Sequence, residues 1–420
     1  MLQANFCSDA LHRAITWLMT SNIRQHDPAL KGYGGFYRLY DRRRKNYDLL
    51  YCEITGYAIS LLTLLHRRHR NSLYLEAAQA AGDFLLRCQL GEQEGGLGGA
   101  FPYSYGSLDN GRNDEIYAFD TAMCLSGLVD LYAETGEKRY LESARAAGEW
   151  LIHQAQNEDG SFQAMYNRET KTGGGGKLAR VWYGDRGCLH AKNAIGLMKL
   201  YRATEEAAYR NAGEKVCWWV LKLQRPDGAF RAKENEKYVF THAHCYATEG
   251  LLYAYFATGV PEFGEAARRA GKWLLSKQTG RGFFYNQYDL PVTQEITYSA
   301  QIGNLGQRLR HVVARLWIKE IRTDAVAQAA RIWVLLYQLT NEERFLRAAY
   351  RAARFLMDMQ VMAGDSNALG GIPFCQWQCL WRRTTSHNLT AWSTMFALHA
   401  WLLLESVQIA DFLQNVEGTF

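Results

Sequence analysis

Two kinds of apolar pattern alternate along this chain. Segments of the first kind are apolar on nearly every helical face; they span residues 53–65, 120–132, 190–201, 242–255, 324–339 and 387–404. The helical segments between them have one apolar face and one polar face. A helix that is apolar all round is buried, whereas a helix with a polar face lies at the surface. The pattern therefore predicts six buried helices that alternate with six half-exposed ones.

Each half-exposed helix ends in a repeated phrase. A glutamine closes the helix, a glycine-containing turn follows, and an aromatic residue comes next, as in AAGEWLIHQAQNEDGSF and EKVCWWVLKLQRPDGAF. The copies are marked by the glycines Gly35, Gly98, Gly160, Gly228, Gly282 and Gly371. The repeat unit is about two helices long, which is typical of a closed array of helical hairpins. We predict an all-α (α/α)6 toroid that forms a single domain over residues 1–420, with an insert at about 287–323 that is either an additional helix or a lid.

Composition fits a packed helical protein and limits its partners. Hydrophobic residues make up 48% of the 420 residues and only six are proline. The net charge of +6 is not concentrated enough for a nucleic-acid partner, and no stretch is long and apolar enough for a membrane span. Nine cysteines without an export signal indicate reduced core thiols, so we expect a cytoplasmic protein. Twelve tryptophans, 25 tyrosines and 18 phenylalanines favour a surface that stacks on sugar rings or on a polyene.

The repeated phrases resemble two groups of toroid proteins. The tail of each outer helix resembles the repeat of prenyltransferases and triterpene cyclases, and AFDTAM at 118–123 resembles the end of their acidic motif, of which only Asp120 is present. The phrases YAFDTA, LHAKNA, THAHCYATEGLL and GGIP resemble bacterial polysaccharide-associated toroid proteins related to glucuronyl hydrolases, polysaccharide lyases and sugar epimerases. The second resemblance implies a carbohydrate-active hydrolase, lyase or epimerase that acts on an acidic or amino-sugar glycan. A terpene-cyclase-like enzyme and a non-catalytic glycan-binding scaffold are the alternatives.

The candidate catalytic residues lie near the starts of the buried helices, which should meet at one end of the ring. His242, Tyr246 and Glu249 are spaced i, i+4 and i+7, so they share one helical face. We predict that this face lines a cavity that also contains Asp120 and His190, whereas His244 packs against neighbouring helices. A histidine or tyrosine base with a neighbouring acid suits proton abstraction from a sugar, and paired carboxylates suit glycoside hydrolysis. Asp324 is interpreted as a helix cap.

Further polar and aromatic residues are candidates for binding the substrate. The set is Tyr117, Tyr183, Arg186, Asn193, Gln328, Trp377, His387 and Trp392. Aromatic residues in the glycine-rich turns predict a sugar-stacking rim, and the partial positive charge at helix N-termini favours an anionic group such as a uronate. Cys188, His190, His242, His244 and Cys245 are of the residue types that bind zinc, but their spacing lacks a zinc-binding motif, so we expect neither a metal nor a cofactor. The pattern leaves the oligomeric state open.

Overall fold

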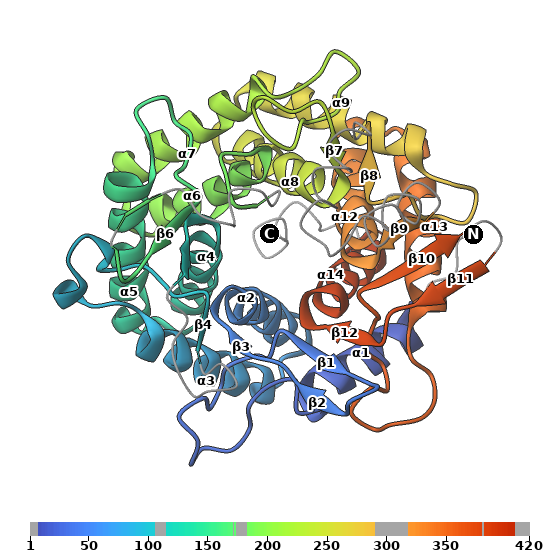
Figure 1. Cartoon of the computed structure of the whole chain (residues 1–420), viewed down its shortest axis with the longest axis horizontal. Coiled ribbons are helices and arrows are strands. Elements are labelled where there is room, and N and C mark those ends of the chain that lie inside the picture. The colour runs from blue at the N-terminus through green and yellow to red at the C-terminus, as the bar shows by residue number, and fades with distance from the viewer. Residues whose placement is uncertain are drawn as a thin grey trace, which may run out of the picture.

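The computed structural model describes residues 7–105, 115–170, 172–173, 183–289, 318–379 and 382–407. Its helices form two concentric rings (Figure 1). The inner ring consists of α2 (Cys52–His69), α4 (Ala118–Thr135), α6 (Asn193–Thr204), α8 (Thr241–Thr258), α12 (Thr323–Thr340) and α14 (Ala391–Ser406). The outer ring consists of α3 (Ser72–Cys88), α5 (Lys138–Trp150), α7 (Ala207–Leu221), α9 (Pro261–Lys277), α13 (Glu343–Met359) and α1 (Ser8–Thr20).

The apolar pattern explains which helices are inside. In α4, every residue from Ala118 to Leu131 is buried, whereas α13 buries only one face. The prediction of six inner and six outer helices is therefore confirmed. The ring closes because α1 packs against α14, and α14 in turn packs against α2.

The repeated glutamine ties each turn to the next outer helix. Gln156 donates from Nε2 to the carbonyl of Gly160 at 3.2 Å and to that of Ala212, in α7, at 2.9 Å. The last copy closes the ring: Gln360 donates to the carbonyl of Ala10, in α1, at 3.0 Å. Equivalent pairs of hydrogen bonds are made by Gln89, Gln224 and Gln278.

The turn after each glutamine requires glycine at one position. Gly160 has φ +91°, and a Cβ there would lie 2.5 Å from the carbonyl oxygen of Lys215, so a side chain would clash with the next outer helix. The same conformation occurs at Gly34, Gly99, Gly228, Gly282 and Gly370. In three of the six copies the constrained glycine is thus one residue away from the one that the repeat marked.

Short strands lie at the end of the ring where the inner helices begin. They are β1 (Leu39–Asp41), β2 (Asn46–Tyr47), β3 (Leu50–Tyr51), β4 (Ser104–Tyr105), β5 (Glu115–Tyr117), β6 (Met165–Asn167), β7 (Val239–Phe240), β8 (Gln287–Tyr288), β9 (Ile318–Arg322), β10 (Cys375–Cys379), β11 (Arg382–Thr385) and β12 (Asn388–Thr390). Their antiparallel sheets are β12-β1-β2, β11-β10-β9, β3-β4, β5-β6 and β7-β8. Five strands run directly into an inner helix, so strand pairing fixes where those helices begin.

The expected insert is described only at its ends. Gln287 and Tyr288 form β8, and Ile318–Arg322 forms β9 rather than a helix. Residues 290–317 lie outside the described part of the chain, as does most of the glycine-rich loop at 171–180. All nine cysteines are free thiols, and eight of them are buried. Within the described ranges, no helix is both long and apolar enough to cross a bilayer.

Candidate active site

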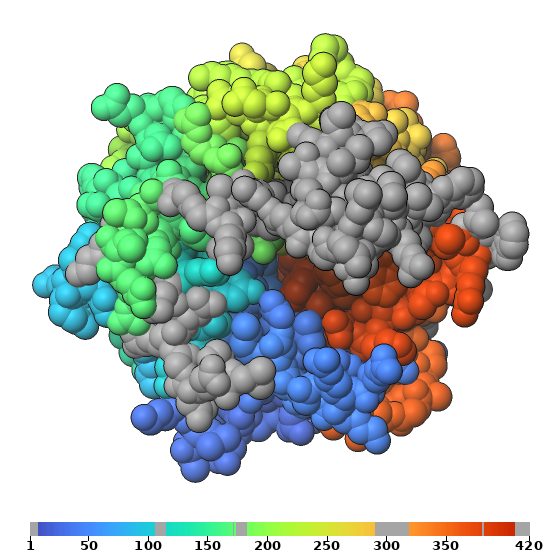
Figure 2. All heavy atoms as spheres, viewed as in Figure 1, coloured from blue at the N-terminus to red at the C-terminus, as the bar shows by residue number. Residues whose placement is uncertain are grey.

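A cavity of about 190 Å³ lies at the strand-bearing end of the ring. Figure 2 shows this face, which is hollowed near the centre of the ring. All six inner-helix units contribute to the wall, either from their first turns or from the residues just before them. The lining residues are Arg38, Tyr51, Glu53, Ile54, Tyr103, Tyr117, Phe119, Asp120, Tyr183, Leu189, His242, Tyr246, Arg322, Phe374 and Trp392.

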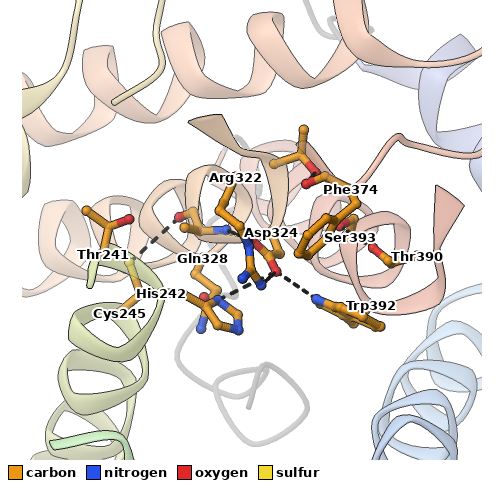
Figure 3. Close-up of polar contacts among 12 residues, drawn as sticks. Thr241, His242, Cys245, Arg322, Asp324, Gln328, Phe374, Thr390, Trp392 and Ser393 are labelled. Carbon is orange, nitrogen blue, oxygen red and sulfur yellow. Dashed lines mark hydrogen bonds and ion pairs between the residues drawn. The ribbon is translucent and has the colours of Figure 1, made fainter. Parts of the chain in front are cut away.

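Asp324 organises one side of this cavity (Figure 3). Its carboxylate accepts hydrogen bonds from Trp392 Nε1 at 2.7 Å and from Arg322 Nε at 3.0 Å, and its side chain is fully buried. Burial alone would raise the pKa of Asp324, but Arg322, His242 and Trp392 together lower it to about 2. Asp324 therefore holds three cavity residues in place and is more than the helix cap that the sequence favoured.

His242 stands beside this carboxylate at the start of α8. Its Nδ1 lies 3.8 Å from Asp324 Oδ2, and its ring centroid lies 4.3 Å from that of Tyr246. Burial lowers the pKa of His242 to about 4, although the charge of Asp324 acts in the opposite direction. The imidazole is therefore neutral near pH 7 and has a lone pair available to accept a proton.

Two carboxyl groups lie in the wall on the side of α2 and α4. Burial raises the pKa of Glu53 to about 7, against hydrogen bonding from Tyr51 and the charge of Lys192. Burial, and next the charge of Glu53, raise the pKa of Asp120 well above its usual value. The cavity thus holds a neutral imidazole and two carboxyl groups whose pKa values burial raises. Such a set of groups can accept one proton and donate another within one bound molecule.

The same architecture occurs in solved structures of sugar-active proteins. A sugar epimerase from a ruminal bacterium is 12% identical, with 95% of this chain and 99% of that chain covered and a TM-score of 0.70. A D-mannose isomerase is 11% identical, with coverages of 96% and 97% and a TM-score of 0.70. An unsaturated glucuronyl hydrolase from Bacillus sp. GL1 is 15% identical, with 95% of both chains covered and a TM-score of 0.63. No protein family and no curated protein sequence matches the chain.

The chain has an (α/α)6 toroid fold. These likenesses extend over almost the whole toroid, and the fold that the repeats predicted is confirmed.

The toroid brings together six of the residues that the sequence singled out. Tyr117, Asp120, Tyr183, His242, Tyr246 and Trp392 all line the one cavity. His244 packs outside it as predicted: its Nδ1 accepts from the backbone N–H of Phe230 at 3.0 Å, and its ring lies 4.8 Å from that of Trp273. The catalytic and binding roles of the six residues stay predictions.

Glu249 does not line this cavity, which corrects the predicted catalytic set. It lies seven residues beyond His242, which places it about 10 Å deeper along the axis of the helix. There it is ion-paired with Lys192 at 2.7 Å and with Arg331, and it accepts from Gln328 Nε2 at 3.0 Å. The prediction that Glu249 shares a helical face with His242 was right, but the prediction that it reaches the same cavity was wrong. Gln328 is likewise part of this deeper group.

His190 and Asn193 are also buried away from the cavity. Residues Cys188–Lys192 form a 3-10 helix rather than an α-helix, so Leu189 reaches the cavity in place of His190. His190 packs instead beside Phe162, with ring centroids 6.0 Å apart. Asn193 is fully buried, and neither end of its amide has a hydrogen-bond partner among the described residues. In the described ranges, no three His, Cys, Asp or Glu side chains gather as a metal site would require.

Three predicted binding residues, Arg186, Trp377 and His387, do not line the cavity. Arg186 is ion-paired on the surface with Asp159 at 3.1 Å and with Glu234 at 2.8 Å. Trp377 lies in β10 with 37% of its surface exposed, and His387 is exposed beside β12. All three lie outside the helices. The periodicity of the helices therefore does not indicate which way their side chains point.

The aromatic wall comes mainly from residues that the turn pattern did not indicate. Among the described aromatic residues in or beside the glycine-rich turns, Tyr103 and Tyr183 line the cavity, whereas Phe36, Phe283 and Phe284 are core residues. The other aromatic rings of the wall are Tyr51, Tyr117, Phe119, Tyr246, Phe374 and Trp392. Sequence reasoning also missed Arg38 and Arg322. The signal that could have found Tyr51 and Arg322 is their place directly before an inner helix, where a strand turns the side chain into the cavity, as it does for the predicted Tyr117.

Proposed function

We propose that this cavity binds the end of a sugar and moves a proton between its carbon atoms, as a sugar isomerase or epimerase does. The observation that carries the proposal is the imidazole of His242, which lies beside Asp324 in a cavity that also holds the buried carboxyl of Asp120, whose pKa burial raises. The names of the similar structures, which include a sugar epimerase and a mannose isomerase, support the same class of substrate.

The proposed reaction begins with an open-chain sugar whose carbonyl faces the acid side. His242 accepts the proton from the carbon next to the carbonyl, while Asp120 or Glu53 donates a proton to the carbonyl oxygen, which gives a neutral enediol. Transfer of that proton from His242 to the former carbonyl carbon, while the hydroxyl of the neighbouring carbon returns its proton to the ionised carboxyl, gives the isomer. Return of a proton to the opposite face of the first carbon gives the epimer and requires a second acid, for which Tyr246 and Glu53 are the candidates. In either case the proton and electron pair are restored, so no redox partner is needed.

Charge pairing in the wall favours a neutral or amino sugar over a uronate. Arg322 is neutralised by Asp324, and Arg38 is ion-paired with Asp48 while donating to the Tyr103 hydroxyl at 3.0 Å. Among the described lining residues, no cation is left for a substrate carboxylate. On the other side, any ionised fraction of Glu53, whose pKa is about 7, would repel it further. This favours the amino-sugar half of the predicted substrate range and disfavours a lyase acting on uronates.

Glycoside hydrolysis is the second candidate, because Glu53 and Asp120 line one cavity and the charge of Glu53 helps to raise the pKa of Asp120. A glycosidase uses one protonated and one ionised carboxyl, and a Glu53 that titrates near pH 7 meets that need. A terpene-cyclase-like reaction is disfavoured. It needs a largely apolar cavity around Asp120, whereas Arg38, Glu53, His242 and Arg322 make this wall polar.

The test uses proton exchange with solvent. The protein is incubated in deuterated water with reducing neutral sugars and amino sugars, and carbon-bound deuterium and new isomers are followed by NMR. We expect deuterium at the carbon next to the carbonyl, and its loss in His242→Gln. In parallel, oligosaccharides including uronates are assayed for new reducing ends and for absorbance of an unsaturated product.

Three outcomes would replace the proposal. New reducing ends without deuterium uptake, lost in Glu53→Gln but retained in His242→Gln, would establish hydrolysis. Sugar binding that persists without any turnover would favour the non-catalytic scaffold. Deuterium uptake that is equal in wild type and His242→Gln would show that another group is the base.

A further inference from the structure

A second, smaller cavity lies deeper inside the toroid. Its volume is about 20 Å³, which is enough for one water-sized particle. It is lined by side chains two turns or so beyond the helix starts that form the upper cavity. They are Tyr57, Ser60, Met123, Ser126, Lys192, Ile195, Arg331 and His399. None of these residues lines the upper cavity.

The charged groups around this cavity leave one positive charge in excess. Lys192 and Arg331 share a single counterion, Glu249. The next pair, Lys199 and Asp130, is neutral by itself, with Nζ 2.7 Å from Oδ2. Burial lowers the pKa of Lys192 to about 8, so its ammonium group is still mainly charged at pH 7. A lone buried charge is costly unless an opposite charge lies near it.

The wall also offers buried hydrogens without acceptors. Arg331 Nη1 lies 3.0 Å from His399 Nδ1, and because a guanidinium can only donate, Nδ1 must be the acceptor. Burial and the charge of Arg331 lower the pKa of His399 well below its usual value, so this histidine is neutral and carries its proton on Nε2. Neither His399 Nε2 nor Arg331 Nε has a hydrogen-bond partner among the described residues, although both side chains are at least 95% buried.

We propose that this deeper cavity binds one small monovalent anion of the size of chloride. The anion would accept from Arg331 Nε and His399 Nε2 and would balance the excess charge of Lys192 and Arg331. A water molecule fits the volume and could donate to the hydroxyl oxygens of Tyr57, Ser60 or Ser126, but it would leave the excess charge of Lys192 and Arg331 unbalanced. Glu53 also acts on the charge of Lys192, but it lines the upper cavity and cannot accept from these two donors.

The first test uses the wild-type chain and needs no substrate. The protein is dialysed into sodium gluconate, and chloride or bromide is added at constant ionic strength while the thermal midpoint is measured. We expect a saturable rise in the midpoint with either halide, because a ligand that binds only the folded state stabilises it. In crystals grown with bromide, we expect an anomalous peak between Arg331 Nε and His399 Nε2.

A pair of histidine variants makes the test specific. His399→Phe removes one proposed donor, and we expect the half-saturating halide concentration to rise at least tenfold. His244→Phe is the control, since His244 is equally buried but bonds only to backbone groups of Phe230 and Ala270. Its halide response should equal that of wild type. Equal midpoints in chloride and gluconate, or a bromide peak only elsewhere in the molecule, would overturn the proposal even if His399→Phe failed to fold.

Discussion

Replacing Asp324 with asparagine tests whether this carboxylate organises the proposed active site. The change keeps the shape of the side chain and one acceptor, but it removes the charge that faces Arg322. The pKa of Asp324 is about 2 in the folded protein against a usual 3.8, which corresponds to about 2.4 kcal/mol. Breaking a buried ion pair on one side costs about 3–5 kcal/mol in general. Because asparagine retains an acceptor for Trp392, we expect a loss of about 2–4 kcal/mol at pH 7.

The pH dependence of that loss has a definite sign. A carboxyl whose pKa is lowered on folding stabilises the protein above its unfolded pKa and loses that contribution as the pH falls through the folded value. The difference between wild type and Asp324→Asn should therefore be constant above about pH 5 and should shrink below pH 4. About half of the 2.4 kcal/mol should be gone by pH 3.

Urea unfolding of both proteins between pH 3 and pH 8 measures this difference. The matched control is Asp48→Asn, which breaks the ion pair with Arg38, where the two side chains are 25% and 33% exposed. Partly exposed pairs contribute only about 0–1 kcal/mol. If Asp324→Asn cost no more than Asp48→Asn at pH 7, or if its cost did not fall with acid, Asp324 would not be the organising group described above.

Two further predictions concern His242 and the closure of the ring. His242→Gln should lower the turnover number of any sugar reaction by about a hundredfold or more, measured as steady-state kinetics, while the urea midpoint changes little; a rate within threefold of wild type would remove His242 as the base. Gln360→Leu should destabilise the chain by about 2–4 kcal/mol in urea, because it leaves the buried carbonyls of Ala10 and Gly370 without their donor. A loss below 1 kcal/mol would show that the glutamine does not hold the ring closed.

The fold was predictable because its signals are local. An inner helix such as 120–132 is apolar on every side within its own sequence, and the glutamine of five of the six repeated phrases makes the same pair of hydrogen bonds. Neither signal depends on a distant part of the chain. The order of the helices around the ring then follows from their order in the sequence.

The site was only partly predictable from the sequence. How far the cavity extends along the inner helices, and which strands pair, both depend on residues that are distant in the chain. Helical spacing placed His242 and Tyr246 correctly, since both fall within the first two turns of α8. The same spacing cannot show that the lumen at the level of Glu249 is filled by Lys192 and Arg331 from other helices. Arg322 reaches the cavity because β9 pairs with β10, more than fifty residues later in the chain.

Because Glu249 lies in the buried ion-paired group and not in the cavity, we expect its substitution to lower stability and not only turnover. As a catalytic residue in an open lumen, Glu249 would be dispensable for folding; as the counterion of Lys192 and Arg331, it is not. Glu249→Gln should therefore destabilise the protein by about 3–5 kcal/mol at pH 7, since two buried cations lose their partner.

Glu53→Gln is the opposite case and serves as the control. The pKa of Glu53 is raised on folding to about 7, so its contribution to stability is complete below pH 4.5 and is lost as the pH rises through 7. Neutralising it should leave the urea midpoint nearly unchanged at pH 4 and raise it at pH 8. If Glu249→Gln kept the wild-type midpoint and lost only turnover, the ion-paired group beneath the cavity would have to be counted as part of the reaction.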